Sequence, residues 1–284
     1  MKITDTCIEC LLSRVKLECL LCDAGPGLTD ATMTACSEMM TRIRSTPLTH
    51  PQIASRIHRK AYDILGNPDP FAELKQRGNR QAIEVCKEIH DDLSTFRDYV
   101  LASVIGNTFD YGVKGHTVEE NFSGFFKREF LKGLTIDDTD KIFPLCSRVI
   151  YLSDNCGEIV LDRLLIKYLT MQGSYVTLAV KEAPILNDAT LRDARELGFD
   201  NLVNLVTTTG GGAEIGISWD SIPDNLRNAI SKCTIIIAKG MANFESLSEM
   251  DNIPPVAFLM AAKCKPVADE VGVSVGSKIA MLRK

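Results

Sequence analysis

The chain has 284 residues, of which 45% are hydrophobic and 24% are charged, and its formal net charge is -5. This length allows one large or two modest domains with a buried core, and the ordinary composition excludes a disordered chain, a collagen-like fibre and a disulfide-built miniprotein. Because the chain is slightly acidic, it has no overall positive field that would attract nucleic acid or an anionic membrane, and we expect neither as a partner.

Residues 1–146 are predicted to form a helical region. The first helix is expected from about residue 6 to 23, with Asp5 as its N-cap and the sequence GPG after residue 24 as its end. Further runs with apolar residues at helical spacing follow along this half. They cover about 30–45, 51–65, 71–93, 95–105 and 117–132.

Residues 147–284 change to short β-branched runs that alternate with amphipathic ones. The expected strands are 148–153, 175–180, 202–207, 234–238 and 255–260, and the expected helices lie near 157–171, 189–197, 223–231 and 243–250. This alternation predicts a Rossmann-like α/β/α domain with a mainly parallel sheet, on which the helical region packs.

Polar side chains follow the predicted strands at the points where they end. In an open parallel sheet, ligands bind beyond the carboxyl ends of the strands, so these residues should meet at one edge. They are Asp154 and Asn155, Lys181, a threonine- and glycine-rich loop at 207–212, Lys239 with Gly240, and Lys263. This set predicts a pocket for a metal ion and an anion.

Three oxygen-bearing side chains are the candidate metal ligands. Asp154 and Asn155 are adjacent at the turn from strand to helix, and Asp188 comes from the next crossover. Two carboxylates and an amide oxygen suit Mg²⁺ or Mn²⁺ better than a thiophilic ion. Each of these residues also fits a helix N-cap, so only their combination favours a metal site.

Lys239 and Glu158 each fit two possible roles. Lys239 follows an apolar strand, where an unpaired charge would be costly, so it either pairs with an acid such as Asp154 or binds a phosphate. Glu158 could position or deprotonate a water, or could interact with the dipole of the helix it begins. Asn107 and Asp110 lie in a polar turn after the helical layer.

Several common site motifs are absent from the sequence. It has no GxxxxGK[ST], no GxGxxG after the first predicted strand of the sheet, and no HExxH. A P-loop, a dinucleotide fingerprint and this zinc-peptidase motif are therefore excluded.

Two CxxC pairs lie near the start of the chain, Cys7 with Cys10 and Cys19 with Cys22. The pairs resemble a zinc ribbon, but the sequence between them reads as continuous helix. At 1.5 Å rise per residue the pairs would be ~18 Å apart, so all four thiols cannot hold one ion. The cysteines could pack in the core, or a single pair could bind a metal or act in redox chemistry, and both possibilities stay open.

No uninterrupted apolar stretch approaches the ~20 residues that span a bilayer. The first ten residues contain acids and cysteines where a signal peptide needs an apolar run. We therefore expect a cytoplasmic protein.

Five segments together resemble one family. They are SDNCGE (153–158), VKEAPILNDAT (180–190), KGMANFE (239–245), GNTFD (106–110) and the amino-terminal CIEC. They are similar to the DUF89 proteins, also called ARMT1-like or damage-control phosphatases, in their short archaeal and bacterial branch. The resemblance covers nearly the whole chain. It implies a helical region on a Rossmann-like domain and a metal-dependent phosphatase that acts on small phosphorylated metabolites, including sugar phosphates and damaged cofactor intermediates.

The resemblance also assigns roles to individual residues. It implies Asp154, Asn155 and Asp188 as metal ligands, Lys239 of the KG motif as a phosphate contact, Asn107 and Asp110 as residues that border the site, and Glu158 as the acid of the DNxGE motif.

The leading hypothesis is hydrolysis of a phosphomonoester with a bound Mg²⁺ or Mn²⁺, with Co²⁺ and Ni²⁺ as further candidates. Lys239, Lys181, Gly240 and the helix amides would contact the phosphate and neutralise its charge. Direct attack by water is favoured over an aspartyl-phosphate on Asp154, because a carboxylate bound to a metal is a poor nucleophile. Two alternatives are a Rossmann-like transferase with a nucleoside cofactor and a non-enzymatic metal or redox protein that uses the amino-terminal cysteines.

Overall fold

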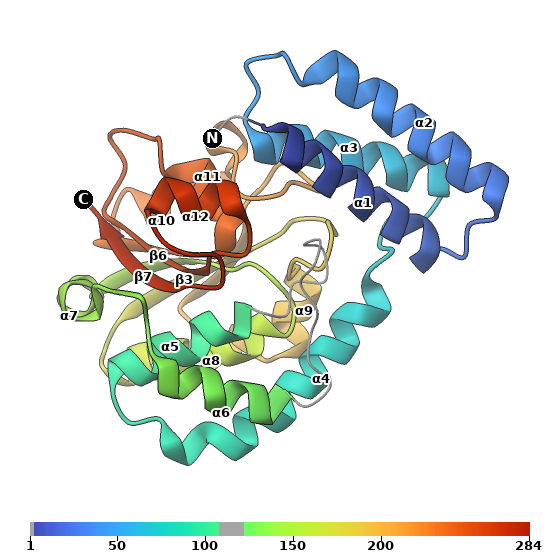
Figure 1. Cartoon of the computed structure of the whole chain (residues 1–284). Helices are drawn as coiled ribbons and strands as arrows, with labels where there is room; N and C mark the ends of the chain where they lie inside the picture. The colour runs from blue at the N-terminus through green and yellow to red at the C-terminus, as the bar shows by residue number, and fades with distance from the viewer. Residues whose placement is uncertain (1–2, 108–121) are drawn as a thin grey trace.

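The structure is a computed structural model, and it describes residues 3–107 and 122–284. It has a layer of three helices beside an α/β unit, as Figure 1 shows. The α/β fold with its mostly parallel sheet and its amino-terminal helical region confirms the predicted fold class.

The first three helices pack on one another around a core that also includes Phe71, Ile185, Leu186 and Ile215. They are α1 (Asp5–Leu21), α2 (Pro26–Ile43) and α3 (His50–Leu65). The first predicted cap is corrected: Thr4 is the N-cap of α1, because its hydroxyl accepts the N–H of Cys7. Pro26 begins α2 rather than ending α1, since the fixed φ of proline suits the first position of a helix.

The next helices cover one face of the sheet instead of joining the first three. They are α4 (Ala72–Ile89), α5 (Phe96–Gly106) and α6 (Phe122–Lys132), and they share a core with α8 (Glu158–Met171). The helices α5 and α8 approach closely at Gly106, where an added Cβ would lie 3.2 Å from the Cβ of Leu161. This contact brings the end of α5 to the start of α8.

The seven-stranded sheet has the order β1-β7-β6-β5-β2-β3-β4. Its strands are β1 (Ile136–Asp137), β2 (Arg148–Leu152), β3 (Tyr175–Val180), β4 (Leu205–Thr208), β5 (Ile235–Lys239), β6 (Val256–Ala261) and β7 (Lys278–Arg283). The sequence analysis missed β1 and β7. All pairs are parallel except β6 with β7.

Alternate side chains of the strands pack on opposite faces. Val149 and Tyr151 of β2 face the core with α5 and α8. Ile150 and Leu152 face the second core, under the remaining helices. Those helices are α10 (Asp224–Ile230), α11 (Gly240–Leu247) and α12 (Lys265–Val271), while α7 (Thr139–Ile142) and α9 (Leu191–Glu196) are short connecting helices.

The domain boundary predicted after residue 146 remains a prediction. The cores group α4 and α5 with the sheet and keep only α1, α2 and α3 in a separate cluster. In the described part of the chain, no helix is long and apolar enough to cross a membrane.

Candidate active site

The turn after β2 carries the first two candidate ligands, and the crossover after β3 carries the third. Asn155 and Asp188 form an isolated antiparallel bridge, and the N–H of Ala189 donates to the carbonyl of Asp154 at 2.8 Å. These backbone bonds hold the two segments side by side. Asp154, Asn155 and Asp188 all line one pocket between the α/β unit and α1.

The alternative prediction, that Asp154, Asn155 and Asp188 are helix N-caps, is wrong. Gly157 is the N-cap of α8, and Thr190 is the N-cap of α9, with Asp193 completing its capping box. The side chains of Asp154 and Asp188 are thus not used as helix caps. Their oxygens lie at the pocket, where the sheet geometry predicted them.

Two asparagine amides orient the acids at this turn. The Nδ2 atom of Asn107 donates to Glu158 Oε2 at 2.7 Å and to Asp154 Oδ2 at 3.2 Å. The Nδ2 atom of Asn155 donates to the same two oxygens, at 3.0 and 2.7 Å. Because the amide nitrogen of Asn155 is directed at these acids, its carbonyl oxygen is the atom that can serve as a ligand. Asn107 is itself anchored, since its Oδ1 accepts the N–H of Ala261 at 3.1 Å.

Lys239 lies in a buried ionic cluster behind the turn. Its ammonium is 3.1 Å from Glu158 Oε1 and 3.1 Å from Asp162 Oδ1, and all three side chains are 0% exposed. It also donates to the carbonyl and the hydroxyl of Ser103. The pairing predicted for Lys239 therefore occurs, but with Glu158 and Asp162 in place of Asp154.

Burial and ion pairing act against each other in this cluster. Burial raises the pKa of Asp162 to about 6, against the lowering effect of Lys239. Burial alone would lower the pKa of Lys239, but Asp162 and Glu158 outweigh it and hold that pKa above its usual value. The ammonium is therefore charged and stays bound to the two acids.

Lys181 is buried beside the third candidate ligand. Its Nζ is 3.6 Å from Asp188 Oδ2 and donates to the carbonyl of Gly216. Gly240 lies against Asp154, the first candidate ligand, since an added Cβ at Gly240 would be 1.9 Å from Asp154 Oδ2. Both residues thus support ligand side chains.

The predicted site residues fall into two groups. Asp154, Asn155 and Asp188 line the pocket. The other described ones, Asn107, Glu158, Lys181, Lys239 and Gly240, are buried and are not among the described residues that line it. Asp110 lies outside the described residues. The proposed phosphate contacts of the second group stay predictions.

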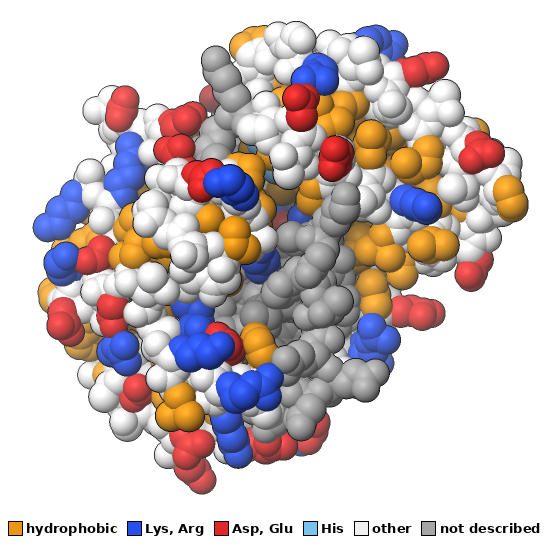
Figure 2. All heavy atoms as spheres, viewed as in Figure 1, with side chains coloured by type: hydrophobic (Ala, Val, Ile, Leu, Met, Phe, Trp, Pro, Cys, Tyr) orange, Lys and Arg blue, Asp and Glu red, His pale blue; other side chains and the backbone are white. Residues whose placement is uncertain are grey.

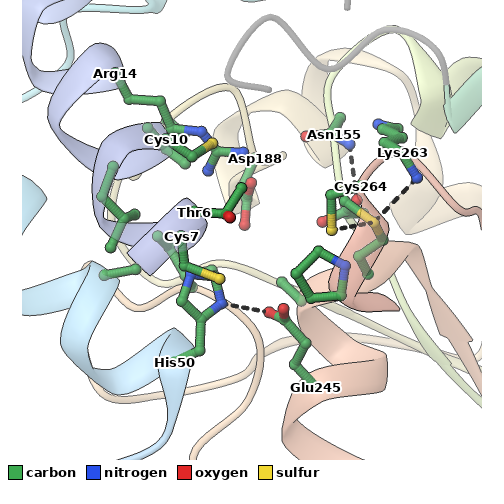
Figure 3. A pocket seen from close by; sticks show the side chains of 18 residues that line it. Thr6, Cys7, Cys10, Arg14, His50, Asn155, Asp188, Glu245, Lys263 and Cys264 are labelled. Carbon is green, nitrogen blue, oxygen red and sulfur yellow. Dashed lines mark hydrogen bonds and ion pairs between the residues drawn. The ribbon is translucent and has the colours of Figure 1, made fainter. Parts of the chain in front are cut away.

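Sequence reasoning missed the part of the pocket wall that comes from the helical layer and from α11. His50 at the start of α3 and Glu245 on α11 are hydrogen-bonded, with His50 Nδ1 2.9 Å from Glu245 Oε2, and both line the pocket (Figure 3). Because the two residues are 195 positions apart, no local sequence pattern predicts this contact. Asp162 was also missed, although an acid inside the apolar run IVLDRLLI, one turn after Glu158, is such a signal.

The donor set fits a hard divalent cation. Two carboxylates and one amide oxygen come from two turns that backbone bonds hold together, and all three side chains are at most 8% exposed. In the described residues, no three His, Cys, Asp or Glu side chains form a ready metal cluster. The candidate ligand set is not such a cluster, because one of its three donors is the amide of Asn155. Among the described residues, no cluster of thiols offers an alternative metal site.

Basic side chains on the visible face of the molecule lie among acidic ones. On the face in Figure 2, basic and acidic side chains are interspersed over the α/β unit. Arg14 of α1 and Lys263 after β6 are the basic residues that line the pocket in the described part of the chain, apart from His50. Anion binding would therefore be local to the pocket.

The chain is similar to known proteins along nearly its whole length. A family model described as the damage-control phosphatase ARMT1-like domain matches residues 3–279. The chain is 42% identical to a damage-control phosphatase of Archaeoglobus fulgidus over 99% of both chains. It is 30% identical to the damage-control phosphatase PH1575 of Pyrococcus horikoshii, over 100% of this chain and 99% of that one. The crystal structure of that Pyrococcus DUF89 family protein is similar over the full length of both chains, with a TM-score of 0.91 and 29% identity.

Proposed function

Because the chain belongs to the family with the damage-control phosphatase ARMT1-like domain, we propose that it is a phosphatase that hydrolyses phosphomonoesters of small metabolites, either sugar phosphates or damaged phosphorylated metabolites. The observation that carries this proposal is the convergence of Asp154, Asn155 and Asp188 on one pocket. Family membership favours a phosphatase over the nucleoside-dependent transferase and over a non-enzymatic metal or redox protein.

We further propose that Asp154, Asn155 and Asp188 hold a divalent cation, with Mg²⁺ and Mn²⁺ ahead of Co²⁺ and Ni²⁺. When bound, such an ion supplies Lewis-acid stabilisation to the phosphoryl oxygens. The chain's own contribution is orientation: Asn107 and Asn155 hold Asp154 and Glu158 in place through their amides. Arg14 and Lys263 on the pocket wall suit the remaining negative charge of the substrate.

Glu158 acts as a positioning residue in this proposal. Both of its oxygens are engaged, one by two amides and the other by Lys239. A carboxylate held in this way is poorly placed to take a proton from water. We retain direct attack by water over an aspartyl-phosphate on Asp154, and incorporation of labelled oxygen from water without a trapped phosphoenzyme tests this choice.

The function is tested by removing divalent metals with a chelator and restoring them one at a time. The wild-type protein is expected to hydrolyse p-nitrophenyl phosphate and sugar phosphates only after a metal is restored. Asp188→Asn keeps the shape of the side chain but loses its charge, so we expect about 100-fold less activity and weaker Mn²⁺ binding by titration calorimetry. Asp200→Asn, at an exposed surface position, serves as the control. Equal activity with and without metal, or in both variants, would overturn the proposal.

We assign proton donation to the leaving oxygen to His50. Histidine is the side chain best suited to exchange protons near neutral pH, and Glu245 fixes the orientation of this ring. An alkoxide leaving group needs the proton, whereas p-nitrophenolate does not. His50→Gln is therefore expected to slow hydrolysis of sugar phosphates about 100-fold and to leave p-nitrophenyl phosphate nearly unaffected.

The control for this variant is His90→Gln, which alters an exposed histidine that also contacts a carboxylate. It should behave like the wild type on both substrates. An equal decrease on both substrates in His50→Gln would contradict proton donation and would indicate a role in binding or packing.

A cytoplasmic location also belongs to this proposal. Ten cysteines in a chain of this length are best kept as thiols in a reducing compartment.

A further inference from the structure

The two CxxC pairs share one helix and one spacing but differ in their surroundings. Cys7 and Cys10, in the first turns of α1, are partly buried and line the pocket with Asp154, Asn155 and Asp188. Cys19 and Cys22, at the other end of the same helix, do not line this pocket, and Cys19 is buried. Only the first pair thus faces the candidate active site.

The spacing of the first pair suits a disulfide. Residues three apart on a helix lie on the same side, with Cβ atoms about 5–6 Å apart. A disulfide needs Cβ atoms about 3.8 Å apart and Cα atoms within about 4.4–6.8 Å. The pair lies at the start of α1, where helix ends fray and the backbone can adjust by this amount.

The first cysteine lies at the start of α1, beside a hydroxyl group. The start of a helix stabilises negative charge through its N–H groups and its dipole. The hydroxyl of Thr4 lies 3.1 Å from Cys7 Sγ and can donate to it. The second pair lies at the opposite end of the helix, and burial raises the pKa of both Cys19 and Cys22, although Asn67 donates to Cys22 Sγ at 3.5 Å.

A third thiol stands on another wall of the same pocket. Cys264 is the N-cap of α12, and its Sγ lies 3.9 Å from Met241 Sδ. Its pKa is raised to about 11, mainly by burial, and Cys7 and Cys10 act in the same direction. These thiols form no ready metal cluster in the described residues, so the arrangement favours thiol chemistry over metal binding.

We propose that Cys7 and Cys10 are a redox-active dithiol in the wall of the active-site pocket, and that their oxidation to a disulfide slows hydrolysis there. The expected effect of the disulfide on hydrolysis rests on the proposed phosphatase function. Helix α1 also supplies Thr6, Leu11 and Arg14 to this wall, so drawing the two cysteines together displaces the wall itself.

The oxidant is a low-molecular-weight disulfide, RSSR. The Cys7 thiolate attacks one sulfur of RSSR, the S–S bond breaks, and one thiolate leaves and takes a proton. Cys10 then loses its proton and attacks the sulfur of Cys7 in the mixed disulfide, which releases the second RSH. Two protein thiols are oxidised, and one RSSR is reduced to two RSH.

The test equilibrates the reduced full-length protein with graded ratios of oxidised to reduced glutathione, then alkylates the free thiols and maps them by peptide mass. We expect Cys7 and Cys10 to form a disulfide at ratios that leave Cys19 and Cys22 alkylated. Cys10→Ser should accumulate a mixed disulfide with glutathione on Cys7, and Cys7→Ser should not. The matched control Cys22→Ser, which breaks the second CxxC, should form the Cys7–Cys10 disulfide as the wild type does.

Hydrolysis of p-nitrophenyl phosphate is measured on the same samples. The rate should fall about 10-fold as the disulfide forms and recover with dithiothreitol, because small displacements at a reacting centre cost this much or more. Cys7 and Cys10 that stay alkylated at every ratio, or a disulfide that leaves the rate unchanged, would overturn the proposal. Failure of the reduced protein to hydrolyse any ester would count against the phosphatase, while thiol mapping would still decide for or against the dithiol.

Discussion

Replacing Gly240 by alanine is expected to lower the phosphatase rate about 100-fold and to weaken divalent metal binding. The new Cβ would lie 1.9 Å from Asp154 Oδ2 and 2.4 Å from its Cγ, so the carboxyl group must move. A displacement of about 1 Å in a reacting site costs on the order of 100-fold in rate. Mn²⁺ affinity by calorimetry and hydrolysis of p-nitrophenyl phosphate measure the two effects.

The matched control is Gly272→Ala. Both glycines have a positive φ, +74° at Gly240 and +76° at Gly272, so both variants carry the same kind of backbone strain, about 1–3 kcal/mol. An added Cβ at Gly272 meets nothing within 4 Å. Gly272→Ala should therefore lose stability but keep wild-type activity and metal affinity. Similar activity losses in both variants would show that strain, and not the displacement of Asp154, is the cause.

Replacing Lys239 by methionine is expected to destabilise the fold by about 3–5 kcal/mol. Glu158 and Asp162 would remain buried without the ammonium that pairs with them, and a buried charge left alone is strongly destabilising. A lysine that only contacted substrate phosphate would give the opposite result, with lost activity and unchanged stability. Urea unfolding of the metal-free protein measures the difference directly.

The destabilisation in Lys239→Met should depend on pH. Without the ammonium, the native state keeps the proton on Asp162 to a higher pH than the wild type does, so its stability falls further as the pH rises. In the wild type, burial has already raised the pKa of Asp162 to about 6. Below that pH the Asp162 carboxyl is protonated in both native proteins, so we expect the stability gap between them to grow as the pH rises above about 6.

Lys265→Met is the control for this variant. Lys265 forms an exposed ion pair with Asp269 at 2.7 Å, and such pairs contribute about 0–1 kcal/mol. This variant should unfold close to the wild type at every pH. A Lys239→Met protein that is as stable as Lys265→Met would contradict the role given to the buried cluster.

The predicted candidate ligands came from local sequence patterns that the fold preserves. Parallel strands end at one edge of their sheet, so Asp154 and Asn155 after β2 and Asp188 after β3 could be placed together from their positions along the chain. The helical and strand periodicities also identified most elements within a few residues. The strands β1 and β7 were not predicted, because β1 has only two residues and β7 pairs antiparallel with β6 instead of following a parallel crossover.

Contacts between distant segments were decided only by tertiary packing. Lys239, at the end of β5, pairs with Glu158 and Asp162 because both acids lie on α8, one turn apart, and face its ammonium. The pair of His50 with Glu245, and the position of Cys7 and Cys10 on the pocket wall, depend on how the α1–α3 layer docks against the α/β unit. By itself, the sequence determined most of the secondary structure, the fold class and which candidate ligand oxygens lie together, because helix and strand periods and strand ends are local properties. The tertiary structure alone decided which charges are paired and which thiols face the site, because burial and distance between remote segments arise only when the layers pack.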